Sequence, residues 1–118
     1  MASIKEYKVI SYLNDNHIEA IVGAQVTVVD DSGPIIDDLA LRLWIEGENS
    51  LGEPIQIVLD ENLHIDVESI TTLEGTLFNP ILSTSDNSYN YRCRLQLIDE
   101  NDNILEEERF ILSVSYNN

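Results

Sequence analysis

The chain contains one pattern twice, and this pattern constrains the fold more than any other feature. Each copy reads apolar pair, acidic turn, apolar pair, two acids, then an alternating segment; the copies cover residues 28–45 and 97–114. Alternation of apolar and polar residues turns one side of a strand toward a core and the other toward water. Each copy therefore predicts a strand, a tight polar turn and a second strand. The corresponding apolar residues of the alternating segments are Leu41, Leu43 and Ile45 in the first copy and Phe110, Leu112 and Val114 in the second.

Short alternating segments recur along the rest of the chain. The clearest covers residues 39–46, where leucine and isoleucine share one face and Arg42 and Trp44 share the other. Gly23 is expected to separate strands over residues 18–22 and 25–29. No convincing amphipathic helix is present. The sequence predicts one all-β domain over residues 1–118, an immunoglobulin-like antiparallel β-sandwich of about seven to nine strands.

The charge of the chain excludes several partners. Twenty-two acidic residues and six basic residues give a net charge of −16 on 118 residues. Nucleic-acid binding depends on basic groups that release counterions, so direct nucleic-acid binding is not expected. The same charge favours solubility and leaves open cation binding or mimicry of a polyanion.

Targeting signals are missing from the sequence. No segment approaches the roughly 20 apolar residues of a membrane span, so membrane insertion is not expected. The first residues lack the basic and apolar pattern of a secretory signal. The expected location is the cytoplasm if the chain is complete, and the cell surface or the exterior if it is an excised domain.

Residues 23–45 resemble bacterial immunoglobulin-like domains of the invasin and intimin type. The resemblance rests on the strand Val26-Thr27-Val28-Val29, the acidic turn Asp30-Asp31-Ser32-Gly33-Pro34 and the alternating strand after it. Tyr91, two residues before Cys93, is similar to the penultimate strand of immunoglobulin folds, where such a tyrosine makes a corner. The resemblance implies a rigid spacer or adhesive module in a bacterial surface protein.

The second acidic turn is a candidate calcium site. Its residues Asp99, Asn101, Asp102 and Asn103 resemble the Asp-x-Asn-Asp-Asn linker pattern of cadherins. Calcium takes six to eight oxygen ligands. The first turn would add oxygens if both turns lay at one end of the sandwich. Alternatively, these residues serve only as turn formers. The candidate ligands from the first turn are Asp30 and Asp31, with Asp37 and Asp38 beside them.

A second metal hypothesis rests on the segment His64-x-Asp66-x-Glu68, whose three side chains would share one strand face. A transition metal could use them with His17 as a fourth ligand, although the spacing matches no known zinc pattern. A solvated strand face is the alternative.

Catalytic motifs are not evident, so the chain is predicted not to be an enzyme. No Gly-x-Ser-x-Gly elbow and no glycine-rich phosphate loop occur. The single cysteine, Cys93, lies in an alternating apolar stripe and is expected to be a buried thiol. With one cysteine, no disulfide within the chain is possible.

Trp44 and neighbouring arginines form the candidate protein-binding site. Trp44 and Arg42 share the polar face of their strand, and Arg92 and Arg94 belong to another strand. Tryptophan and arginine are enriched at interface hot spots. The alternative is that the N-terminal segment covers Trp44.

The expected function is a non-enzymatic binding or scaffold module that acts through protein contacts, with an unidentified protein partner. One alternative is an acidic inhibitor that imitates the charge of a nucleic acid. Another is a self-assembling structural or decoration protein, in which the edge strands over residues 5–13 or 109–116 pair between copies.

Overall fold

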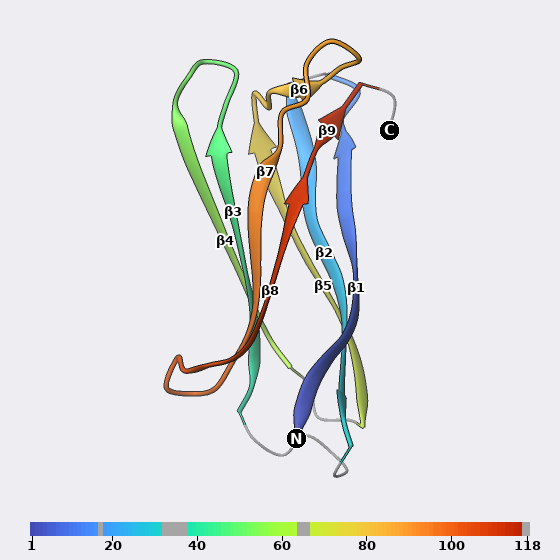
Figure 1. The fold of residues 1–118 in the computed structure, drawn as a ribbon, viewed down its shortest axis with the longest axis vertical. Helices are drawn as coiled ribbons and strands as arrows, with labels where there is room; N and C mark the ends of the chain where they lie inside the picture. The colour runs from blue at the N-terminus through green and yellow to red at the C-terminus, as the bar shows by residue number, and fades with distance from the viewer. Residues whose placement is uncertain (17, 32–37, 64–66, 117–118) are drawn as a thin grey trace.

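The computed structural model describes residues 1–16, 18–31, 38–63 and 67–116. In these ranges the chain forms antiparallel sheets packed face to face, without a helix, and the predicted all-β sandwich is confirmed (Figure 1). None of the described residues forms a helix able to cross a membrane. The strands are β1 (Ala2–Leu13), β2 (Glu19–Asp30), β3 (Ala40–Glu48), β4 (Pro54–Asn62), β5 (Glu68–Phe78), β6 (Leu82–Ser83), β7 (Tyr91–Ile98), β8 (Ile104–Leu112) and β9 (Val114–Ser115).

Two sheets make up the sandwich. One has three strands in the order β1-β2-β5, and the other has four in the order β4-β3-β7-β8. The short strands β6 and β9 form a separate parallel pair. The chain crosses between the sheets after β2, after β4 and again after β5. Among the described residues this distribution resembles an immunoglobulin-like sandwich in which β4 is added beside β3 and the opposite sheet has three strands instead of four.

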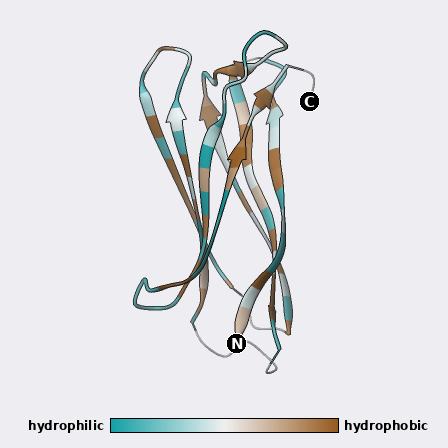
Figure 2. Cartoon of the chain, in the orientation of Figure 1, coloured by the Kyte–Doolittle hydropathy of each residue, from teal (hydrophilic) through white to brown (hydrophobic). Residues whose placement is uncertain are grey.

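The core lies between the inner faces of the two sheets. β2 contributes small apolar residues, whereas β3 and β7 contribute larger ones, and Figure 2 shows hydrophobic residues alternating along these strands. The predicted inward face of residues 39–46 is confirmed. The core residues with no measurable exposure include Val22, Val26, Val28, Leu41, Leu43, Ile45, Tyr91, Leu95 and Leu97.

The prediction that Gly23 separates two strands is wrong. β2 continues through Gly23, which pairs with Ile10 of β1 and Glu74 of β5. A Cβ atom at Gly23 would lie 1.8 Å from the carbonyl oxygen of Leu73. The glycine is therefore needed for close approach of two strands and does not end one.

The repeated pattern does not produce two hairpins. Its second copy is a hairpin, because β7 and β8 pair on either side of the turn at residues 99–103. Its first copy instead connects β2 of one sheet to β3 of the other, so the prediction is wrong there. In the second copy the N–H of Asn103 donates to Asp99 Oδ1 at 2.9 Å and helps to close the turn. The corresponding residue of the first copy is Pro34, which has no N–H to donate.

The connection between β4 and β5 lies partly outside the described residues. β4 ends at Asn62 and β5 begins at Glu68. Leu63 and Val67 lie in no strand, and residues 64–66 between them are outside the described residues.

Tyr91 makes the contacts of a tyrosine corner. Its hydroxyl accepts a hydrogen bond from the N–H of Ile81 at 2.9 Å and donates one to the carbonyl of Glu48 at 2.7 Å. Burial raises the pKa of Tyr91, so the hydroxyl keeps its proton. Two residues on, the Cys93 thiol is buried as predicted, and burial raises its pKa to about 12.

Substituting Gly23→Ala is expected to lower the free energy of unfolding by about 3 kcal/mol, because the new Cβ atom collides with backbone. Urea denaturation monitored by circular dichroism measures the change. Gly52→Asn is the control, because a side chain at Gly52 meets no atom within 4 Å and asparagine tolerates its positive φ of 77°. Equal stability of the two variants would contradict the close approach.

Substituting Tyr91→Phe is expected to lower the free energy of unfolding by about 1–3 kcal/mol, because it leaves a backbone donor and acceptor without their shared partner. The control is Tyr12→Phe, since the Tyr12 side chain is 45% exposed. If both variants unfold at the wild-type denaturant concentration, the corner does not stabilise the fold.

Candidate functional site

The outer face of the four-stranded sheet carries the candidate protein-binding residues. In the sheet register Trp44 of β3 lies between Val58 of β4 and Arg94 of β7. Residues directly opposite each other in neighbouring strands project to the same side. The register therefore places Arg42, Trp44, Arg92 and Arg94 on one side of the sheet.

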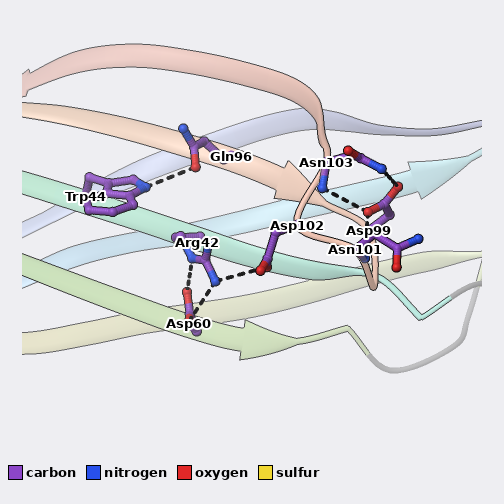
Figure 3. A network of polar contacts seen from close by, with 8 residues as sticks. All are labelled: Arg42, Trp44, Asp60, Gln96, Asp99, Asn101, Asp102 and Asn103. Atoms are coloured by element: carbon purple, nitrogen blue, oxygen red, sulfur yellow. Dashed lines mark hydrogen bonds and ion pairs between the residues drawn. The ribbon is translucent and has the colours of Figure 1, made fainter.

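Trp44 and Arg94 form the centre of this face. The Arg94 guanidinium carbon lies 4.8 Å from the centroid of the Trp44 ring, in a cation–π contact. The indole N–H of Trp44 donates to Gln96 Oε1 at 3.0 Å (Figure 3). Arg94 also donates to Glu46 at 2.8 Å, and this bond is the largest cause that lowers the pKa of Glu46. Trp44 is thereby held in a fixed position.

The N-terminal segment does not cover Trp44. Residues 2–13 form β1, which belongs to the other sheet of the sandwich. The alternative in which this segment buries the indole is therefore wrong, and Trp44 is half-buried by its neighbours in its own sheet.

Arg42 forms a second polar cluster on the same face. Its Nε donates to Asp60 Oδ1 at 2.7 Å and its Nη2 to Asp60 Oδ2 at 3.3 Å. The Nη2 atom also reaches Asp102 Oδ1 at 3.4 Å (Figure 3). These carboxylates, Asp60 first, raise the pKa of Arg42. Arg42 thus connects β4 to the β7–β8 turn and has less freedom to contact a partner.

The structure adds Arg109, which sequence reasoning missed. Arg109 of β8 pairs directly with Arg94 of β7, and its side chain is 74% exposed. All four arginines of the chain consequently lie on one face of one sheet. The only sequence signal was the place of Arg109 in the alternation of the second repeat. We call Arg42, Trp44, Arg92, Arg94 and Arg109 the arginine face.

A shallow hollow of about 500 Å³ lies on this face between β3, β7 and β8. Arg92, Arg94 and Arg109 line it together with Glu46 and Ile111. Arg92 is exposed and makes no ion pair with any residue in the described ranges. The hollow therefore offers guanidinium groups beside an exposed apolar side chain.

The candidate calcium turn is closed by its own hydrogen bonds. Asp99 Oδ1 accepts the N–H groups of Asn101 and Asn103, both at 2.9 Å, and Asp99 Oδ2 accepts the Asn103 side-chain amide at 3.0 Å (Figure 3). These bonds, that from the Asn103 backbone first, lower the pKa of Asp99. Asp102 adopts a left-handed φ of 62° and points its carboxylate toward Arg42.

The C-terminal end of β2, which is Asp30, lies at the same end of the sandwich as the β7–β8 turn (Figure 1). Asp30 and Asp31 pair with the amino group of Met1 at 3.0 Å and 2.9 Å. The hydrogen bond from this amino group lowers the pKa of Asp31. Within the described ranges, no three carboxylate, histidine or cysteine side chains converge on a point. Calcium binding stays a prediction.

The second metal hypothesis falls mostly outside the described residues. His17, His64 and Asp66 belong to the undescribed part, and Glu68 is the first residue of β5. Asp37 is likewise undescribed, whereas Asp38 is exposed just before β3.

The sequence matches no family model and no curated protein. Solved structures do contain similar folds. Parabacteroides merdae β-glucuronidase matches 96% of this chain with a TM-score of 0.67 and 16% identity, and Bifidobacterium dentium β-glucuronidase matches 96% with a TM-score of 0.61 and 14% identity. Amycolatopsis orientalis exo-chitosanase CsxA matches 95% with a TM-score of 0.57 and 16% identity.

These similarities concern a small part of each enzyme. The matched regions cover 13% of the Parabacteroides chain, 18% of the Bifidobacterium chain and 13% of the Amycolatopsis chain. At such identities the similarity shows the fold, which is that of a β-sandwich module.

The hydrogen bonds to Asp99 predict a pH-dependent contribution to stability. Because the pKa of Asp99 is lowered in the folded state, its carboxylate stabilises the fold above the ordinary aspartate pKa of about 3.9. This contribution is lost as pH falls through the lowered value. Asp99→Asn should therefore unfold more easily than wild type at pH 7 and approach wild type near pH 2–3.

Urea denaturation at several pH values measures this difference, with Asp86→Asn in an exposed loop as the control. A difference between wild type and Asp99→Asn that stays constant from pH 7 to pH 2 would contradict the role assigned to the carboxylate.

Proposed function

We propose that this chain is a non-enzymatic β-sandwich module that binds another protein through the arginine face. The observation that carries the proposal is the placement of the four arginines and the single tryptophan on one face of a chain with a net charge of −16. The fold supports a binding module, because a rigid sheet presents these side chains in fixed register.

The local charge of the arginine face differs from that of the whole chain. Three acidic residues of this face, Glu46, Asp60 and Glu107, pair with Arg94, Arg42 and Arg109. Local charges are therefore nearly balanced, whereas the remainder of the chain is strongly acidic. A protein partner with an acidic surface would be repelled by the remainder of the chain and would not be repelled by the arginine face.

The chemistry of the face indicates the kind of partner. Arg92 and Arg109 offer guanidinium groups to carboxylates, which they can bind in a bidentate manner. Val58 and Ile111, 43% and 60% exposed, flank these charges with apolar surface. A surface that combines carboxylates with apolar side chains would be complementary to both.

The non-enzymatic part of the proposal is supported by Cys93. With its pKa raised to about 12, this buried thiol stays protonated at neutral pH and offers no nucleophile.

We place the module in a bacterial surface protein, as a spacer or adhesive unit. The support is the resemblance of residues 23–45 to invasin and intimin domains together with the β-sandwich fold. The solved structures of similar fold also contain such a sandwich as a minor part of a longer chain.

Site-specific photocrosslinking tests the binding face. A photoreactive amino acid at Ile111 on the arginine face is compared with one at Ile70 on β5, in the organism that encodes the chain. The two positions are matched, since the side chains are 60% and 64% exposed. We expect a crosslinked protein from Ile111 that disappears when Arg92→Glu and Arg109→Glu reverse the charge. Crosslinking of equal yield from both positions, or insensitivity to the charge reversal, would contradict the proposal.

A further inference from the structure

The exposed edge of β4 is a second surface, beside the arginine face. The sandwich has four sheet edges, formed by β1, β5, β4 and β8. Within the described residues β4 pairs with β3 alone, and Figure 1 shows it at the outer margin of its sheet. An edge strand presents unpaired N–H and C=O groups that can pair with an added strand.

The hydrogen bonds at the two ends of β4 define which groups are unpaired. The N–H of Asn49 donates to the carbonyl of Glu53 at 3.0 Å, and the N–H of Leu63 donates to the carbonyl of Leu39 at 2.9 Å. Odd-numbered residues therefore bond β3, because residues alternate in an antiparallel ladder. The N–H and C=O groups of Gln56, Val58 and Asp60 consequently point away from β3.

The edges at β1 and β8 are protected from strand addition. The β1 register shifts between Ile4 and Glu6, and the β8 pairing shifts at Leu97 and Ile98. β8 carries four consecutive charged residues, over 106–109. Bulges and charges of this kind block edge pairing.

The β5 edge is less favourable than that of β4. Gly75 lies within β5, where a glycine weakens a strand, and a Cβ atom there would lie 2.9 Å from the Leu59 side chain of β4. Glu68 and Glu74 add charge to the same strand. β4, in contrast, contains the run Ile55-Gln56-Ile57-Val58-Leu59, which has no charge, proline or glycine. The centre of β4 thus lacks the charges, bulges and prolines that protect an edge.

The surroundings of β4 indicate the charge of the added strand. A hollow of about 440 Å³ lies between β4 and β5, and its lining includes Asp60, Glu61 and Glu74. Glu53 flanks the opposite end of β4. An added strand with basic residues at its ends would meet these carboxylates, while apolar residues at its centre would pack beside Val58 and Leu59.

A second copy of the chain fits this edge poorly. Pairing two β4 strands antiparallel about Ile57 would set Glu53 of each copy opposite Glu61 of the other. Like charges directly opposite each other in a sheet are destabilising, and each copy carries a net charge of −16. We infer that β4 accepts an extended segment of another protein, with an apolar centre and basic ends, as an added antiparallel strand.

Amide hydrogen exchange followed by NMR tests this inference. The probe is a synthetic peptide with lysines at both ends and alternating valine and threonine between them. With free peptide tenfold above its dissociation constant, the amides of Gln56, Val58 and Asp60 should exchange about tenfold more slowly. The amides of Ile57 and Leu59, already bonded to β3, should change little. Unchanged exchange at all five amides would overturn the inference.

Val58→Pro is the decisive variant. Proline removes an outward N–H and leaves the bonds between β3 and β4 in place, so it should abolish the protection by peptide. Val58→Thr, which keeps the N–H, is the matched control and should retain it. If Val58→Pro does not fold, Val58→Lys serves instead, because it adds a charge that repels the basic peptide. Protection retained in the proline or lysine variant would overturn the inference.

Two further arms identify the occupant. Protection of the same amides that rises with protein concentration alone would show a second copy at the edge and overturn the proposal of a basic segment. Equal protection by a peptide with glutamates in place of lysines would also overturn the proposal of a basic segment. Arg92→Glu and Arg109→Glu should leave protection by the basic peptide intact, so this test is independent of the arginine face.

Discussion

The alternation of apolar and polar residues along β3 and β7 is the constraint on which the rest of the structure depends. These are the two central strands of the four-stranded sheet, and one register joins them. The register that sets Leu43 against Leu95 in the core also sets Trp44 against Arg94 outside. A shift of one residue would expose the core and bury the arginines, at a cost that no surface contact could offset. Burial of the inner face therefore holds the outer face in place.

The uneven distribution of charge follows from the same register. A net charge of −16 opposes compaction, yet many acids lie in turns and on exposed strand positions where water screens them. The guanidinium groups lie on the arginine face, where Glu46 accepts a hydrogen bond from Arg94 and Glu107 accepts one from Arg109. The pKa of Glu46 and of Glu107 is lowered in the folded state, by bonds from Arg94 and from Gln96 respectively. The face is thus a balanced polar network within an acidic surface.

The sequence was sufficient for local features and insufficient for long-range ones. Alternation correctly predicted the faces of residues 39–46, and the spacing of Tyr91 and Cys93 predicted a corner and a buried thiol. The pattern could not show that β2 and β3 belong to different sheets, because a strand and turn look alike whichever sheet the next strand joins. The Pro34 difference between the copies was the available signal.

The interpretation of Gly23 was wrong for a related reason. A glycine is needed at this position because of the carbonyl of Leu73, which is fifty residues away in sequence. Arg109 was missed because its position opposite Arg94 is determined by the register of the β7–β8 hairpin, which the sequence does not show.

The arginine face and the β4 edge meet at Val58. Its side chain lies opposite Trp44 on the arginine face, while its backbone N–H points away from β3 at the edge. A strand added to β4 would extend the sheet and place its own outward side chains beside Val58. The charges across this extended surface would be ordered, with the carboxylate of Asp60 at the β4 side and guanidinium groups of Arg92 and Arg109 at the β8 side. Such an order favours one orientation of a partner that has a basic extended segment and an acidic surface next to it, because the reverse orientation brings like charges together.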